Sequence, residues 1–315
     1  GLDLADPALD ERSFGAWLLE QGETPAAIAG FWDLLIRPTV NVSAADASLA
    51  LATKVFQTGL LEAAGNADIG WARVPLQELH GEAAARALRR GGAQVHTRAR
   101  VARIDSAADG ATLTCADGAR IAADAVIVAA AHEEAADLLP PAAGVDPAAL
   151  RKLGRAPIVN LHVVFDRRVT DHALLAGTGT PLEWIFDRSQ GAGLEAGQYL
   201  VISLSAADAY VGVRVEELKR IFLPELERLL PRVRSAQLLR FHVTCERAAT
   251  FHQVPGTRRL RPGPSTSLRG VVLAGAYTDT GWPATMESAV RSGLAAARRA
   301  LRDVGRTRGL PAEAA

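Results

Sequence analysis

The chain has 315 residues, enough for about two domains, and its 49% hydrophobic and 22% charged residues are typical of a folded protein. Its 35 Lys and Arg balance 35 Asp and Glu, so charge gives no reason to expect a nucleic-acid partner. The two cysteines, Cys115 and Cys245, lie far apart and outside any CxxC pair, which argues against a disulfide framework and a structural zinc site. No apolar run reaches ~18 residues and the first residues are acidic, unlike a signal peptide. We therefore expect a cytoplasmic protein, with peripheral contact with a membrane left open.

The first part of the chain is predicted to be helical. Over residues 10–65, apolar side chains such as Phe14 and Leu18 recur at helical spacing. The segment around Pro38 is expected to interrupt these helices, because proline lacks the N–H that a helix interior needs. A third helical run is predicted over 44–61.

A change to strands is predicted after the next helix. Residues 76–90 carry an apolar stripe of helical period, and Gly91-Gly92 follows it as a helix end. Short strands are then expected at 93–97, 101–104, 112–115 and 120–121, the last two joined by a turn at Asp117-Gly118. The continuous apolar run 125–131 predicts a buried parallel strand.

The middle of the chain is predicted to form a separate mixed sheet covered by a helix. Strand candidates lie at 158–165, 183–186, 199–205 and 238–244, and the helix at 213–230. Residues 255–267 are rich in turn-forming residues and indicate a loop. A buried strand at 271–274 and a helix reaching about residue 302 complete the predicted order, with a tail over 305–315.

The stretch 271–293 is the most informative. Its strand ends at Gly275, where the missing side chain lets backbone approach a ligand, and Pro283 is expected in the first turn of the following helix. That helix N-terminus suits a phosphate or the carbonyl edge of a reduced flavin. One helix face is predicted to consist of Met286, Ala289, Val290, Gly293 and Ala297. Gly293 is expected to pack so closely on a strand that leucine there would cost roughly 1–3 kcal/mol.

The run LAGAYTDTGWPATMESAVRSG resembles the C-terminal flavin motif of the FAD-dependent amine oxidase and phytoene desaturase superfamily. In detail it is most similar to the hydroxysqualene dehydroxylases, also called squalene-associated FAD-dependent desaturases. The segments 75–104, 124–131 and 249–264 also fit this family. The resemblance covers most of the chain and implies FAD as the cofactor.

The resemblance also implies a cofactor site. Val101 would contact the adenine through its backbone, Ala129 and Ala130 would lie near the pyrophosphate, and Gly275 and Ala276 beside the ribityl chain. Ala284, Thr285 and Met286 would offer N–H groups to the isoalloxazine ring. Ala276 stands where many members of the superfamily have an acid, so that contact is expected to be lost or made by backbone.

The implied fold is α/β with two interleaved domains. An FAD-binding domain of the glutathione-reductase-like Rossmann type would comprise 73–131 and 263–304, and a substrate domain 1–72 and 132–262. The N-terminal Rossmann fingerprint is not found: residues 191–196 match GxGxx[GA], but 197–205 read as a strand where the motif needs a helix. We expect the phosphate-binding unit upstream of Gly1, and therefore weak flavin binding by this chain alone.

The implied reaction is reductive dehydroxylation of hydroxysqualene to squalene, with hydride supplied by reduced FAD. Trp184, Phe186 and Trp282 are candidates to line an apolar substrate tunnel, although core packing is the ordinary role of such residues. Asp279 and Glu287 are weak candidates for the acid, since either could simply complement the helix dipole. Other enzymes of squalene synthesis are conceivable partners.

Two alternatives to this interpretation stay open. A carotenoid-type desaturase or an amine oxidase of the same superfamily would oxidise its substrate instead. A truncated, non-catalytic chain would only bind isoprenoid or a partner protein. A metal site is not expected, because His242 and Cys245 of the group His242, Cys245 and His252 should point to opposite faces of a strand.

Overall fold

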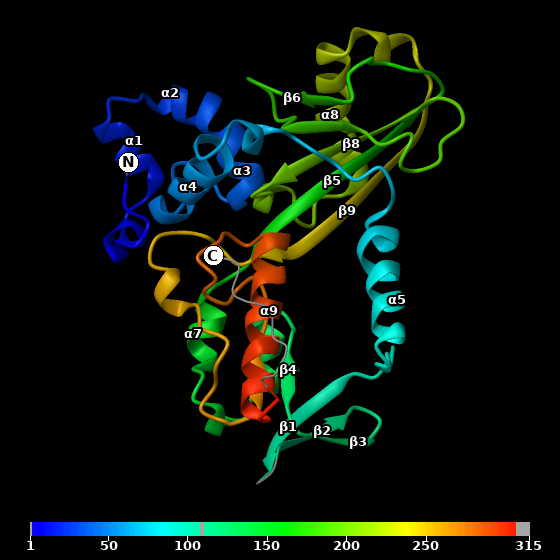
Figure 1. Cartoon of the computed structure of the whole chain (residues 1–315). Coiled ribbons are helices and arrows are strands. Elements are labelled where there is room, and N and C mark those ends of the chain that lie inside the picture. Colours follow the sequence, from blue (N-terminus) through cyan, green and yellow to red (C-terminus); the bar gives the residue numbers. More distant parts are fainter. Residues whose placement is uncertain (1, 108–109, 307–315) are drawn as a thin grey trace.

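The structure, a computed structural model, describes residues 2–107 and 110–306 (Figure 1). Its strands form a five-stranded sheet in the order β6-β7-β8-β5-β9, a three-stranded sheet β1-β2-β3 and a two-stranded pair β10-β4. In Figure 1 the N-terminal helices lie beside the large sheet, and the pair with helix α9 lies below it. This arrangement bears out the expected α/β class. The assignment of residue ranges to two interleaved domains stays a prediction.

The N-terminal helices are α1 (Phe14–Glu20), α2 (Pro25–Ala27), α3 (Asp33–Val40) and α4 (Leu49–Phe56). Helices α1, α3 and α4 share one core, in which Leu18, Ile36 and Leu49 are almost completely buried. The predicted interruption at Pro38 is wrong, because α3 continues through it to Val40. Pro38 has no N–H to bond to the Leu34 carbonyl, which instead accepts a hydrogen bond of 3.2 Å from the indole N–H of Trp184.

The large sheet consists of β5 (Ala156–Phe165), β6 (Leu174–Ala176), β7 (Trp184–Asp187), β8 (Gln198–Ser205) and β9 (Leu238–Thr250). All its described pairings are antiparallel, rather than mixed as expected. Helix α8 (Val215–Leu229) covers one face as predicted, with Phe222 and Leu226 packed against Leu161 and Val163. The alternating burial along β5 leaves the other face of the sheet more open.

The smaller sheet contains β1 (Val101–Ala107), β2 (Gly110–Cys115) and β3 (Arg120–Ala123), with the predicted hairpin turn at Asp117-Gly118. The helix predicted before it is present as the π-helical turn η5 (Gln77–Glu82) followed by α5 (Ala83–Arg90), which ends at Gly91. The strand predicted over 93–97 is wrong. Those residues pair with no strand of the described chain, and Val95 is exposed.

The parallel strand pair joins β4 (Val126–Val128) to β10 (Val271–Leu273), in register Val126 with Val271 and Val128 with Leu273. A parallel strand was predicted here, but it is buried on one face only. Val126 and Val128 are buried, whereas Ile127 is 42% exposed. Helices α6 (His132–Leu138) and α7 (Pro147–Lys152) pack on the core behind this pair.

Helix α9 (Met286–Asp303) begins three residues later than expected. Pro283 precedes it, and the hydroxyl of Thr285 caps it by accepting a hydrogen bond of 3.2 Å from the N–H of Ser288. The face that packs on the strand pair carries Ser288, Ser292, Ala296 and Ala300, whereas Met286, Val290 and Leu294 are exposed.

The close packing predicted for Gly293 is therefore wrong. A Cβ atom built on Gly293 would have no neighbour within 4 Å outside its own helix turn. Small side chains on the other face, Ser292 and Ala296, let α9 approach the strands instead.

Two remaining points concern the ends of the chain and membranes. The part of the predicted tail over 307–315 lies outside the described residues. No helix among the described residues combines the length and the apolar character that crossing a bilayer requires.

Candidate flavin and substrate site

The parallel strand pair brings together two of the segments predicted to hold FAD. The N–H of Ala274 donates to the carbonyl of Val128 at 3.0 Å, so the two segments continue side by side beyond the paired strands. Ala129 and Ala130 follow β4, and Gly275 follows β10, at the same edge. This edge is the carboxyl end of parallel strands, where α/β sheets bind nucleotide cofactors.

Gly275 is required by the turn itself. Its φ of 149° favours glycine, and a Cβ atom there would lie 2.5 Å from the ring of Tyr277 and 3.4 Å from the carbonyl oxygen of Ala130. Its N–H donates to the hydroxyl of Ser292 at 2.8 Å. The missing side chain of Gly275 thus makes room for the ring of Tyr277, whereas the sequence predicts that it makes room for a ligand.

A buried arginine, Arg261, holds the turn that follows. Its guanidinium donates to the carbonyls of Ala276, Tyr277, Thr278 and Trp282 at 3.2, 3.2, 2.6 and 3.0 Å. Desolvation lowers the pKa of Arg261 to about 10, so the group stays charged at neutral pH. The sequence analysis missed this residue, because nothing in the pattern distinguishes Arg261 from the neighbouring Arg258 and Arg259.

A buried glutamine connects the helical segment with the turn before α9. The Gln253 side chain donates to the carbonyl of Val40 and accepts a 2.7 Å hydrogen bond from the N–H of Ala284. The N–H of Thr285 donates to the carbonyl of Pro283 at 2.8 Å. Of the three predicted isoalloxazine donors, only Met286 has its N–H in the first helical turn, outside the intrahelical ladder.

The predicted adenine contact lies on the same core as the turn. Val101, Ala130 and Ala284 all pack against one cluster of buried residues that includes Tyr277. Ala129 is exposed beside it. Val101, Ala130 and Ala284 thus come from three separate parts of the chain and pack on one core, and their contact with FAD stays a prediction.

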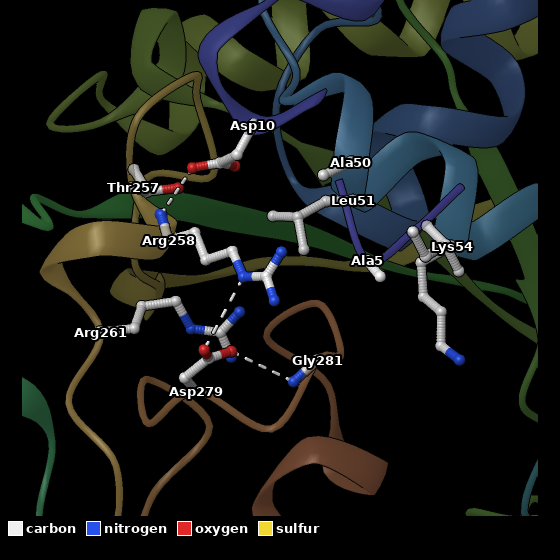
Figure 2. Close-up of a pocket in the computed structure, with 11 residues that line it drawn as sticks. Ala5, Asp10, Ala50, Leu51, Lys54, Thr257, Arg258, Arg261, Asp279 and Gly281 are labelled. Carbon is white, nitrogen blue, oxygen red and sulfur yellow. Dashed lines mark hydrogen bonds and ion pairs between the residues drawn. The ribbon is translucent and has the colours of Figure 1, made fainter. Parts of the chain in front are cut away.

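A charged cavity of about 280 Å³ lies between this turn and the N-terminal helices (Figure 2). Asp279 lines it, with a carboxylate oxygen 3.8 Å from Nε of Arg258 and another that accepts a hydrogen bond from the N–H of Gly281. On the opposite wall, buried Asp10 accepts from the N–H of Arg258 at 2.8 Å, and burial raises the pKa of Asp10. Acidic and basic groups thus alternate around this cavity.

Trp282 follows Gly281, a residue of the charged cavity, and two cations lie over its ring. The Lys54 ammonium and the Arg291 guanidinium each lie 4.7 Å from its ring centroid. Arg291 also pairs with Glu287 at 2.7 Å. Both weak candidates for the acid, Asp279 and Glu287, are therefore ion-paired with arginines.

An apolar cavity of about 500 Å³ lies between the N-terminal helices and the open face of the large sheet. Trp184 and Phe186 on β7 line it, together with Leu34 and Leu35 of α3. Trp282, Asp279 and Glu287 do not.

An ion-pair network holds the walls of the apolar cavity together. Arg37 of α3 pairs with Glu183, just before β7, at 3.1 Å and with Asp33 at 3.2 Å. Glu183 also accepts a hydrogen bond of 2.9 Å from the N–H of Ser205. Burial raises the pKa of Glu183, and the positive charge of the neighbouring Arg37 acts in the opposite direction.

The chain thus combines a parallel strand pair, at whose carboxyl edge predicted cofactor residues lie, with an antiparallel sheet that carries an apolar cavity. Residues 2–301 match the family described as flavin containing amine oxidoreductase, and the chain belongs to this family. The match confirms the superfamily expected from the C-terminal motif, and with it a flavin as the family's cofactor.

The similar curated proteins include a hydroxysqualene dehydroxylase and a 15-cis-phytoene desaturase. A hydroxysqualene dehydroxylase from Sinorhizobium fredii is 36% identical over 179 residues, covering 56% of this chain and 39% of that protein. A 15-cis-phytoene desaturase from Solanum lycopersicum is 29% identical over 231 residues, covering 67% of this chain and 39% of that protein. The chain thus spans about two fifths of the length of these curated relatives.

Solved structures show the same fold. A cyclohexylamine oxidase from Brevibacterium oxydans superposes with a TM-score of 0.68 at 17% sequence identity, covering 94% of this chain and 69% of that chain. At this identity the likeness concerns the fold alone.

Proposed function

We propose that this chain belongs to an FAD-dependent oxidoreductase that acts on a long isoprenoid, and that its reaction is the reductive dehydroxylation of hydroxysqualene to squalene. The observation that carries the proposal is the apolar cavity lined by Trp184 and Phe186. A hydrocarbon chain offers almost nothing to hydrogen-bond, so it needs such walls. The 36% identity to the Sinorhizobium fredii dehydroxylase supports the particular reaction.

The residues at the strand edge fit the flavin. The carboxyl ends of β4 and β10 lie together, and the first turn of α9 presents the N–H of Met286. Ala129, Ala130, Gly275 and Ala276 would hold the cofactor here, with Val101 near the adenine. When bound, reduced FAD supplies the hydride that replaces the hydroxyl group of the substrate.

The chain's own residues then have three tasks. Arg261 holds the turn against the core, so the backbone at Ala276 keeps one position. Arg37 and Glu183 fix α3 against β7. Trp184 and Phe186 exclude water from the reacting part of the substrate, which strengthens electrostatic interactions there.

A second candidate reaction is desaturation of a carotenoid precursor. The alignment with the tomato phytoene desaturase covers more of this chain, 67% against 56%, although at lower identity. An amine substrate is less well served by the cavity at Trp184, because its walls are mainly apolar.

The two reactions require opposite flavin states, which gives the test. The chain, and the same chain extended through any residues that its gene encodes upstream of Gly1, is incubated without oxygen with reduced FAD and hydroxysqualene. Squalene formation with the return of the oxidised flavin's visible absorbance supports the proposal. Consumption of phytoene with oxidised FAD, and no squalene from hydroxysqualene, would establish the second candidate instead. Binding of isoprenoid without either reaction would support a non-catalytic chain.

A further inference from the structure

A chain of hydrogen-bonding side chains lies on the open face of the large sheet. Ring nitrogen Nδ1 of His162 lies 2.6 Å from the hydroxyl of Tyr199, and Nε2 lies 2.9 Å from the hydroxyl of Thr244. The ring of His242 lies 5.8 Å from that of His162, centroid to centroid. These four residues line a cavity of about 700 Å³.

The sequence analysis did not find this cluster. It grouped His242 with Cys245 and placed them on opposite strand faces, and the register bears out that separation. Cys245 pairs with Val159, whose side chain belongs to the core under α8, whereas His242 pairs with His162. Only the pairing of β5 with β9 brings the two histidines together.

The cluster and the apolar cavity share one face of the sheet. Phe186 of the apolar cavity pairs with Val201, which pairs with His162. Trp184 pairs with Ser203, which lies opposite Asn160, and Asn160 lies opposite Thr244. Neighbouring strands are ~4.8 Å apart, so His162 lies only about 10 Å from Phe186 across the sheet. A long isoprenoid in the apolar cavity can therefore reach the cluster.

The hydrogen-bond chemistry of the cluster suits an alcohol. Burial and the neighbouring His242 lower the pKa of His162, so its ring is neutral and one nitrogen donates while the other accepts. The hydroxyl that accepts from the ring keeps its proton free, and the hydroxyl that donates to the ring keeps its oxygen lone pairs free. With either tautomer, Tyr199 and Thr244 together offer one free donor and one acceptor. A hydroxyl ligand both donates and accepts, whereas a hydrocarbon does neither.

We propose that His162, Tyr199 and Thr244 bind the hydroxyl group of an isoprenoid alcohol whose hydrocarbon chain lies against Trp184 and Phe186. This inference rests on the proposed function and makes it more specific, because it assigns the polar end of the substrate. A hydrocarbon such as phytoene has no group for this cluster to bind.

The test is a binding measurement that needs neither flavin nor turnover. Hydroxysqualene and squalene, each delivered in cyclodextrin, are titrated into the chain while tryptophan fluorescence is recorded, and a Trp184→Phe variant assigns the signal to the cavity. We expect hydroxysqualene to bind roughly 3- to 10-fold more tightly than squalene. His162→Phe removes this preference. Thr244→Val reduces the preference with almost no change of shape, and His96→Phe, on the exposed 91–100 segment, retains it.

The outcomes separate the two proposals. Equal affinity of the wild-type chain for both ligands, or an unchanged preference in both His162→Phe and Thr244→Val, would overturn the hydroxyl site while leaving the isoprenoid cavity intact. Binding of neither ligand would contradict the proposed function, and this inference with it.

Discussion

At the scale of single residues, the site depends on buried polar side chains that hold backbone in place. Arg261 and Gln253 each connect segments that are distant in sequence, and both are almost completely buried. Trp184 and Phe186 stand out in the sequence as aromatic residues on one strand face, and the structure places both on an apolar cavity, whereas their contact with a substrate stays a prediction. Arg261, Gln253 and His162 were not found, because their partners are backbone carbonyls or neighbouring strands that only folding brings near.

The role of Arg261 predicts a large cost for its loss. Arg261→Met leaves four carbonyl acceptors without their charged donor, so we expect the free energy of unfolding to fall by at least about 2 kcal/mol in urea denaturation. Arg259→Met is the matched control, because Arg259 is exposed and its only ion pair within the described part of the chain is with exposed Glu11. That variant should change stability by less than ~0.5 kcal/mol. Equal effects of the two substitutions would show that Arg261 does not hold the turn.

We expect His132 to contribute to the loss of folding stability at acidic pH. It is 6% exposed, its Nε2 atom has no hydrogen-bond partner among the described residues, and burial lowers its pKa from 6.5. Below pH 6.5 the unfolded chain therefore takes up a proton that the folded chain resists, so stability falls as the pH falls. His132→Phe should lose less stability than the wild type between pH 7 and pH 5, measured by urea denaturation at each pH. Identical pH dependences would refute the assignment.

At the scale of elements, hydrophobic period and turn residues predicted most helices and strands. The hairpin at Asp117-Gly118, the strand 158–165 and the helix over 76–90 all formed as expected. The predictions of secondary structure were wrong where contacts between distant parts of the chain determine the local structure. The Trp184 indole uses the carbonyl that Pro38 frees, and the strand predicted at 93–97 has no described neighbour to pair with.

We expect alanine substitution at two helical glycines to change the stability in opposite directions. Gly293 in α9 has open space around its Cβ position, so Gly293→Ala should raise the free energy of unfolding by ~0.5–1 kcal/mol through helix propensity. A Cβ atom on Gly15 in α1 would lie 2.5 Å from the Ala45 backbone. Gly15→Ala should therefore lower the free energy of unfolding by roughly 1–3 kcal/mol. The free energies of unfolding of the two variants are measured by thermal and urea denaturation and compared with that of the wild type. Destabilisation by Gly293→Ala would restore the original expectation that Gly293 is closely packed.

At the scale of the whole molecule, the strand pair and α9 leave an apolar surface uncovered. Met286, Val290 and Leu294 on α9 are 64, 59 and 51% exposed. Ile127 is also exposed, and it pairs with Val272 on the face that α9 partly covers. Exposed apolar side chains that form a patch can bind partners or promote aggregation.

This surface predicts binding of a hydrophobic dye. Replacing Met286, Val290 and Leu294 by Glu, Lys and Glu should lower the fluorescence of bound anilinonaphthalene sulfonate without lowering the free energy of unfolding, since these side chains make few contacts. Leu19→Glu, at a position of α1 that is 51% exposed, is the control and should leave dye binding nearly unchanged. Undiminished dye binding by the triple variant would place the apolar surface elsewhere.

The central claim is that the cavity at Trp184 and Phe186 holds the isoprenoid that the flavin reduces. Its most direct test compares Phe186→Asp with Phe31→Asp, since Phe186 lines the cavity and Phe31 is 55% exposed and outside it. In anaerobic reactions of the flavin-loaded protein with hydroxysqualene, we expect Phe186→Asp to abolish squalene formation and Phe31→Asp to retain it, with both variants binding FAD as the wild type does. Unchanged squalene formation by a folded, flavin-loaded Phe186→Asp protein would contradict the account.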